Sequence, residues 1–494
     1  MSTTIALPQA KPEAAPRRSL RSFLAIDQQA RFQAFAQTLT GRALIFAIGL
    51  AAISPYFGLW SGLLAISAAL AAAYLPKFRN PILFTATWLT AFVETALSGN
   101  SFAEHIGLVV RQEGLTELPP VWLAVGSLFC LLVAMRSILV FVGQHPKSLI
   151  ARRPVLTLLV IEAFICALTT LEIMHGLPRV LLWAMLVVAT PFLWFLPYAI
   201  IDQRSAAPNP ALLQMGALRP FWSPAYLPFG KGAAFLNKAL AKTPDDLAIT
   251  QLKGIKLLLW ANLLIALQTG LSWIFVIQLS TPTVAQTIDA FLQSRAYPLG
   301  ISWTALAFST TKFALQVAIW VHLFIGVARL AGYRLPRGSW RPLESRTLMD
   351  YFNRFHYYFK ELLVDFFFAP TFFTTFKKHP RLRMFFATFM AAAVGNALWH
   401  FIRDIDLIAR IGPAAAFETY TSYLFYCVVL ATGVGLSQIR VNSGIRPSNT
   451  VAGKLWSFSF VWSFVVCMHL FSDGSRQHSL SDRLSFLTSL FGVL

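Results

Sequence analysis

Residues 121–143 read VWLAVGSLFCLLVAMRSILVFVG, an apolar run that contains a single charged residue, Arg136. A helix needs about 20 apolar residues to cross the hydrocarbon core of a bilayer, so this run predicts a transmembrane helix. Comparable runs lie at 42–58, 60–75, 81–98, 154–174, 178–201, 256–279, 300–330, 382–402, 418–440 and 450–472. The interrupted apolar segment 361–376 predicts a re-entrant or interfacial element. The sequence therefore predicts an all-α polytopic membrane protein with about ten to twelve transmembrane or re-entrant helices.

The composition of the whole chain excludes a soluble globular protein. Of the 494 residues, 56% are hydrophobic and only 13% charged, whereas soluble domains carry about a quarter charged residues. The net charge of +20 comes from Lys and Arg in short segments between the apolar runs, such as Lys77 with Arg79 and Lys147 with Arg152. This placement is typical of basic cytoplasmic loops and not of a nucleic-acid-binding domain. A basic cytoplasmic face also attracts anionic donors such as coenzyme A or an acidic carrier protein.

The order of polar and apolar segments predicts five regions. They are a cytoplasmic N-terminal segment with an amphipathic surface helix (1–41), N-terminal transmembrane helices (42–201), a basic cytoplasmic connector (202–255), a core (256–476) and an amphipathic C-terminal tail (477–494). The N-terminus is expected on the cytoplasmic side. The four cysteines have no spacing typical of disulfides or zinc, and no metal site is expected.

A few charged side chains fall inside apolar runs, where they are costly and therefore informative. Arg136 and Glu162 each lie near the middle of a run and are candidates to pair across helices. Glu94 is a similar case. For each of them, a satisfied partner inside the bundle is favoured over a direct chemical role.

Two short motifs carry most of the chemical information. Residues 350–356 read DYFNRFH and 365–370 read DFFFAP, whereas 395–400, after a run of small residues, read GNALWH. A neutral imidazole suits the removal of a proton from a hydroxyl at physiological pH, so His400 at the end of its span is a candidate general base. Small residues before it let helices approach closely and leave room for a channel. The alternative is a histidine that bridges or packs helices.

These motifs, in this order, resemble the membrane-bound O-acyltransferase (MBOAT) family. The likeness is to the bacterial branch that acylates cell-surface polymers, such as alginate O-acetylases and teichoic-acid D-alanyl transferases. An ungapped match to the first family motif covers Asp350, Arg354, His356, Asp365 and Pro370. Leu398-Trp399-His400 matches the second motif, whose histidine is the catalytic residue of the family. The family's Ser-Leu-Ser after the first histidine is replaced by residues 358–360, which leaves donor and acceptor open.

The resemblance implies an MBOAT-like bundle around a catalytic channel, with His400 and His356 as catalytic residues. The expected substrate-binding residues are Asn353, Arg354, Tyr357, Trp399 and Asn396. The expected structural residues are Asp350, in an N-cap-like position, together with Asp365 and Pro370. Arg354 also fits a structural role, with Asp365, in a buried ion pair or a helix cap. For His356 the alternative is an aromatic and basic belt at the headgroup level.

The expected function is an integral-membrane O-acyltransferase of the bacterial inner membrane. It would move an acetyl or other short acyl group from an acyl thioester (acetyl-CoA or acyl carrier protein) to a hydroxyl of a surface glycan or lipid-linked saccharide. No bound cofactor is expected. Membrane lipids and a periplasmic acyltransferase are further expected partners, and nucleic acid is not. The alternatives are a lipid O-acyltransferase and a non-catalytic transporter or acyl-relay scaffold.

Overall fold

A computed structural model describes residues 25–96, 102–170, 173–204, 209–472 and 477–493. The part of the expected surface helix before residue 25 lies outside the described residues, and the part after it contains the short helix α2 (Ala30–Gln37). The described residues form helices and no strand. Seven helices are long and apolar enough to cross a membrane, or up to nine if each of two bent pairs is one span. One shorter apolar helix, Pro154–Thr170, accompanies them. The chain is an all-α polytopic membrane protein, as predicted.

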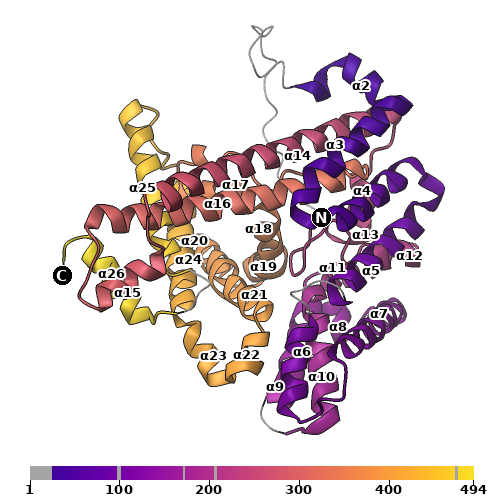
Figure 1. The fold of residues 1–494 in the computed structure, drawn as a ribbon, viewed down its shortest axis with the longest axis horizontal. Coiled ribbons are helices and arrows are strands. Elements are labelled where there is room, and N and C mark those ends of the chain that lie inside the picture. Colours follow the sequence, from indigo (N-terminus) through magenta and orange to yellow (C-terminus); the bar gives the residue numbers. More distant parts are fainter. Residues whose placement is uncertain (1–24, 97–101, 171–172, 205–208, 473–476, 494) are drawn as a thin grey trace.

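The N-terminal helices form one side of the molecule, from indigo to magenta in Figure 1. They are α3 (Leu39–Phe57), α4 (Leu59–Tyr74), α5 (Arg79–Ala96), α6 (Phe102–Gln112), α7 (Pro120–Gln144), α9 (Pro154–Thr170), α10 (Gly176–Ala189) and α11 (Leu196–Gln203). The chain bends by 113° between α4 and α5 and by 70° between α10 and α11. Pro76 lies at the first bend and Pro191 lies just before the second. Proline favours such bends because it has no N–H to donate to the helical hydrogen-bond pattern.

Two long helices, α14 (Pro244–Ser272, continued by the π-helical η4, Trp273–Gln278) and α16 (Leu299–Leu330), lie side by side across the molecule (Figure 1). Glycine permits their close approach. A Cβ at Gly254 would lie 2.9 Å from the carbonyl oxygen of Gly326, and one at Gly326 would lie 2.5 Å from Leu258. Backbone-to-backbone contact of this kind is typical of packed membrane helices.

The C-terminal half carries the motif residues. Its helices are α17 (Leu348–Phe355), α18 (Tyr357–Leu363), η6 (Val364–Phe368), α19 (Ala369–Thr374), α20 (Pro380–Phe389), η7 (Met390–Gly395), α21 (Asn396–Arg403), α22 (Asp406–Ile411), α23 (Pro413–Thr419), α24 (Thr421–Asn442) and α25 (Val451–His469). Residues 361–376 fall in short helical pieces that are not among the candidate spans. A second apolar cluster joins the C-terminal α26 (Leu480–Leu490) to α15 (Val284–Leu292) through Phe486 and Ile288.

The segment 202–255, expected as a basic cytoplasmic connector, contains helices and buried aromatic residues. It contains α12 (Ala211–Gly216) and α13 (Gly232–Ala239), and α14 already begins at Pro244. Trp222 and Phe229 are buried, and the Trp222 indole donates to the carbonyl of Phe229 over 3.2 Å. Polar residues made this stretch look like a loop, but several of them are used inside the fold.

Arg136 and Glu162 each have a hydrogen-bond partner on another helical element, as expected, although they do not pair with each other. Arg136 donates to the Gln214 side chain (3.4 Å), and Glu162 accepts from the Thr190 hydroxyl (2.9 Å). Glu94 forms an ion pair with Arg219, which lies in the supposed connector and is 5% exposed. The sequence located the charges that need partners, but two of the three partners, Gln214 and Arg219, come from the segment 202–255, which carries no apolar run.

Candidate functional site

His400 lies in the last turn of α21, at the end of the candidate span Pro380–Arg403. Its half-buried ring packs against three aromatic side chains, with centroid distances of 4.7 Å to Trp399, 4.4 Å to Tyr423 and 6.3 Å to Phe359. Asn396, one turn earlier and buried, accepts a hydrogen bond from the Tyr423 hydroxyl (3.2 Å). The predicted residues His400, Trp399 and Asn396 therefore lie together.

A π-helical turn, η7, precedes His400 and contains the small-residue run. Such turns insert an extra residue per turn and are frequent at functional sites. A Cβ on Gly395 would lie 2.6 Å from the ring of Phe367, which belongs to a second π-helical turn, η6. The small residues thus let the two π turns meet, which fixes how the helix carrying His400 leaves the bundle.

Trp399 is held from the segment that was expected to be a connector. Its indole donates to the carbonyl of Tyr226 over 2.9 Å. Tyr226 has a φ of +66°, a left-handed conformation that costs energy for a non-glycine residue and is retained where the surroundings impose it. Burial raises the pKa of Tyr226, so its phenol stays neutral. Nothing in the sequence signals this contact, because the acceptor is a backbone carbonyl.

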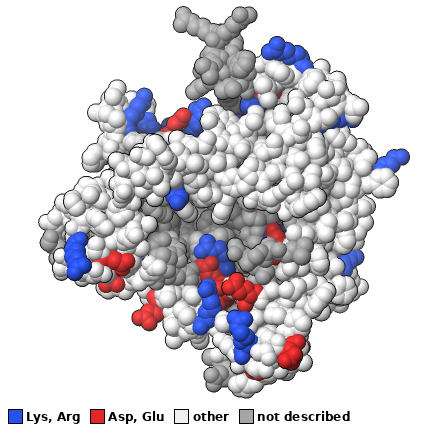
Figure 2. Space-filling view, in the orientation of Figure 1, with Lys and Arg blue, Asp and Glu red and all other residues white. Residues whose placement is uncertain are grey.

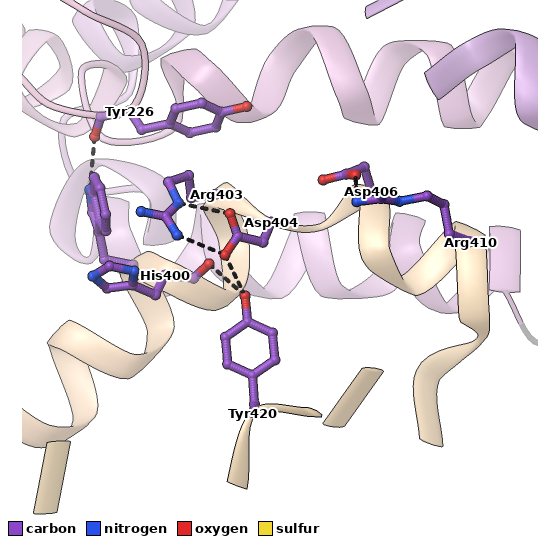
Figure 3. Close-up of polar contacts among 8 residues, drawn as sticks. Tyr226, His400, Arg403, Asp404, Asp406, Arg410 and Tyr420 are labelled. Atoms are coloured by element: carbon purple, nitrogen blue, oxygen red, sulfur yellow. Dashed lines mark hydrogen bonds and ion pairs between the residues drawn. The ribbon is translucent and has the colours of Figure 1, made fainter. Parts of the chain in front are cut away.

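A polar network fixes the end of α21 (Figure 3). Arg403 and Asp404 form a two-pronged ion pair with N–O distances of 2.7 and 2.9 Å. The Tyr420 hydroxyl lies 2.9 Å from the carbonyl oxygen of His400 and 2.9 Å from the Asp404 carboxylate. The Arg403 guanidinium also lies over the Trp399 ring, 5.4 Å from its centroid. The sequence analysis missed these residues, although an Arg-Asp pair directly after the motif, at the end of a span, was a usable signal.

His356 caps the helix α18. Its Nδ1 accepts a hydrogen bond from the backbone N–H of Phe359 (3.4 Å), and burial lowers its pKa from 6.5 to about 4. The ring is therefore neutral at physiological pH, with its proton on Nε2, where it can donate but not accept. The Phe359 ring lies 5.9 Å from the His356 ring and 6.3 Å from that of His400. One phenylalanine thus contacts both motif histidines.

The remaining residues of the first motif have local partners. The N-cap of α17 is Thr347, so the expected N-cap-like place of Asp350 is wrong: Asp350 stands three residues later and accepts from Arg354 over 2.7 Å. Arg354 also lies over the ring of Trp340, 5.1 Å from its centroid. Asn353 is exposed on the same helix. These contacts tie α17 to the preceding segment, and they involve no residue of the His400 cluster.

Asp365 pairs with Lys231 and not with Arg354. The Lys231 ammonium lies 2.6 Å from Asp365 and 2.7 Å from Glu361, and the Tyr198 hydroxyl donates to Asp365 over 2.8 Å. Burial alone would lower the pKa of Lys231, but the two carboxylates outweigh it and the net shift is upward. For Glu361, Lys231 and Lys360 outweigh burial and lower the pKa. This cluster joins the segment before α13 to α18 and η6.

Tyr357 and Pro370 occupy the ends of the same stretch. The Lys360 ammonium lies 4.7 Å from the centroid of the Tyr357 ring. Pro370 stands in the first turn of α19, where a missing N–H costs nothing, and is exposed.

The charges near the site are mostly balanced. Figure 2 shows Lys or Arg and Asp or Glu side chains gathered over the position of α21 and α22, where Arg410 also pairs with Asp406 (2.6 Å). Among the described residues no group of three or more His, Cys, Asp and Glu side chains could hold a metal ion. The arrangement offers an imidazole within aromatic walls, hydroxyl and amide groups beside it, and a rigidly held helix end. Comparison with protein-family models and with curated protein sequences finds no match for this chain.

Proposed function

We propose that this chain is a membrane O-acyltransferase of the MBOAT type, with His400 as the general base. The observation that supports the proposal is the contact of Phe359 with both motif histidines. The two sequence motifs were recognised separately, and one side chain that lies between them in the chain, Phe359, packs against the histidine of each. Helix bridging by a histidine needs no such shared neighbour.

In the proposed reaction, His400 takes the proton of an acceptor hydroxyl while the oxygen attacks the carbonyl carbon of an acyl thioester. The carbon–sulfur bond breaks, an ester forms, and the proton passes to the departing thiolate, so that a thiol is released. Trp399, Tyr423 and Phe359 cover part of the imidazole and so limit the access of water to it, which favours acyl transfer over hydrolysis. Asn396 and Tyr423 are polar groups near the ring that can orient the acceptor.

His356 serves the reaction in this proposal as a neutral donor and helix cap, since its Nδ1 is already engaged. We further propose an acetyl or other short acyl group from a cytoplasmic thioester, and a glycan or lipid-linked saccharide as acceptor. The basic segments then face the cytoplasm, with the N-terminus on that side and the protein in a bacterial inner membrane.

The test is mass spectrometry of ester-linked acyl groups on the surface glycans and lipids of host cells. Cells without the protein are compared with cells that carry the wild type, His400→Ala or His379→Ala at matched expression. His379 is an exposed histidine just before the span that ends with His400, and so controls for the loss of a histidine in this part of the chain. We expect an ester with the wild type and His379→Ala and a decrease of at least about 100-fold with His400→Ala. Full ester with His400→Ala would contradict the proposal and favour a transporter or acyl-relay scaffold.

A further inference from the structure

A recess of about 340 Å³ opens where the first turns of α3 and α14 meet the ends of α4 and α16. Three cationic side chains line it: Arg42, Arg79 and Lys242. No Asp or Glu is among the described residues that line it. It shares no residue with the His400 cluster. A concave site with this charge is suited to an anionic ligand and is large enough for a phosphate with a small headgroup.

The cations are held by neutral partners. The Arg42 guanidinium lies over the Tyr74 ring, 4.4 Å from its centroid, and the Arg79 Nε donates to the carbonyl of Ala72 over 2.9 Å. Lys242 is exposed at the rim. Across the described parts of the chain, none of these three side chains forms an ion pair. Their positive charges are therefore available to a ligand.

The floor of the recess is ordered before any ligand binds. The Tyr74 hydroxyl donates to Gln251 over 2.7 Å, and the buried Gln251 amide donates to the carbonyl of Leu330 over 3.0 Å. Thr243 and Pro244, the N-terminus of α14, also line the recess and add the positive end of a helix dipole.

Two carboxylates lie nearby but outside the lining. Asp245 accepts from the Gln37 side chain over 2.7 Å, and Asp246 lies 3.7 Å from the Arg334 guanidinium. They reduce the positive potential at the rim, but both have partners of their own. The recess itself keeps three cations without a matching anion.

The surroundings place the recess at a membrane surface. It lies at the start of one candidate span, Leu39–Phe57, and next to the bend within the helix pair Leu59–Tyr74 and Pro76–Ala96. Leu39, Leu75 and Phe78 beside it are 84, 49 and 60% exposed. Exposed apolar side chains next to a cationic recess match the two parts of an anionic lipid, its acyl chains and its phosphate.

We infer that this recess binds the phosphate of an anionic ligand, between Arg42, Arg79 and Lys242. A phospholipid headgroup and a soluble phosphorylated compound share this chemistry, and the flanking apolar side chains favour the lipid. The inference stands apart from the proposed acyl transfer, since no residue that lines the recess belongs to the His400 cluster.

The test uses the purified full-length protein in a non-ionic detergent. Binding of dioctanoyl phosphatidylglycerol, dioctanoyl phosphatidylcholine and coenzyme A is measured by thermophoresis at low and moderate salt. The double variant Arg42→Gln with Lys242→Gln is compared with Arg446→Gln with Lys454→Gln. The control pair is exposed near the start of α25, outside the recess, and removes the same charges. Arg79 is left intact because its bond to Ala72 also holds the chain bend.

We expect phosphatidylglycerol to bind more tightly than phosphatidylcholine, and the affinity to fall with added salt. The recess variant should weaken this binding at least about tenfold, since two charge-assisted contacts are lost, while the control pair and His400→Ala leave it unchanged. A different result would be that coenzyme A binds through Arg42 and Lys242 while phosphatidylglycerol binds no more tightly than phosphatidylcholine. This result would support the phosphate site and assign it to a soluble ligand. Binding that is equal in both double variants, for every ligand, would overturn the inference. Matched thermal unfolding midpoints verify that the variants fold.

Discussion

The N-terminal helices and the His400 region use polar side chains in different ways. Among the N-terminal helices, carboxylates form ion pairs with arginines from other segments of the chain, as in the pairs of Glu94 with Arg219 and Glu113 with Arg179. Around His400, polar contacts join several elements, because Tyr420 bridges the His400 carbonyl and Asp404. The first arrangement neutralises charge inside a membrane protein. The second holds one titratable ring in place, which is what a catalytic site requires.

The largest effect on stability is expected from Glu94→Gln. The Arg219 side chain is 5% exposed, so removing the carboxylate paired with it leaves a buried charge with less compensation. We expect a loss of about 3 kcal/mol of unfolding free energy, at the lower end for a buried pair because Glu94 is partly exposed. Ester formation per folded molecule should not change. The measurement is thermal and denaturant unfolding in detergent.

Glu117→Gln is the control for that variant, since Glu117 is exposed and forms no ion pair in the described structure. It should unfold like the wild type. If Glu94→Gln kept its stability but lost ester formation, the N-terminal pair would belong to the site and the contrast between the two regions would fail.

The next largest effect is expected at the contact between the two π turns. In Gly395→Ala the new Cβ would lie 2.6 Å from Phe367 and 3.0 Å from Leu363, so side chains or backbone must shift. We expect a loss of about 2 kcal/mol, together with reduced ester formation because the helix carrying His400 moves.

The same substitution at Gly270, in α14, provides the matched control. No atom lies within 4 Å of a Cβ built there, so Gly270→Ala should be neutral or slightly stabilising. Equal behaviour of the two variants would show that the π turns tolerate separation and that their contact does not position His400.

The spans were predictable because twenty apolar residues in a row have few other structural uses. The run 121–143 appears as α7, Pro120–Gln144. The start of α14 was missed because Gln251 and its neighbours read as polar, whereas Gln251 is buried and donates to the carbonyl of Leu330. Hydropathy counts a buried glutamine as a loop residue even when another helix satisfies it.

The sequence predicted only those residues of the candidate site whose side-chain types belong to a recognisable motif. His400, Trp399 and Asn396 were named from their motif and lie together. Tyr226 and Tyr420 were not, because their bonds join positions 173 and 20 residues apart and end on backbone carbonyls. Every residue has such a carbonyl, so no pattern in one sequence distinguishes these two.

A smaller effect is expected from Tyr420→Phe, which keeps the ring and removes the hydroxyl that bridges His400 and Asp404. The end of α21 gains freedom, so we expect ester formation to fall about tenfold while the unfolding free energy falls by about 1 kcal/mol. The rate at saturating substrate should fall more than the apparent substrate affinity. Tyr297→Phe, at an exposed tyrosine, is the control. If Tyr420→Phe lowered the stability but not the rate of ester formation, the Tyr420 contacts would serve only stability, as the ion pairs of the N-terminal helices do.

The smallest effect is expected at His356 and depends on pH. Its pKa is about 4 in the folded chain, against an ordinary 6.5, so between these values the unfolded chain binds a proton that the folded chain does not. Stability is therefore complete above pH 6.5 and falls as the pH decreases toward 4. Asparagine keeps an N-cap acceptor for the Phe359 N–H but does not titrate. When the pH falls from 7 to 5, the unfolding free energy of His356→Asn should therefore decrease by about 1 kcal/mol less than that of the wild type. This difference is smaller than the full pKa shift implies, because solvent partly screens the partly exposed ring.

The matched variant for this last comparison is His379→Asn, at the N-cap of α20, where the exposed histidine makes no capping bond. It removes a histidine from a helix N-cap without removing a capping bond, and its unfolding is measured over the same pH range. If His356→Asn and the wild type lost stability in parallel on acidification, the buried neutral state of His356 would be wrong. His356 would then be free to accept a proton, and it would join His400 as a candidate base instead of serving as a cap.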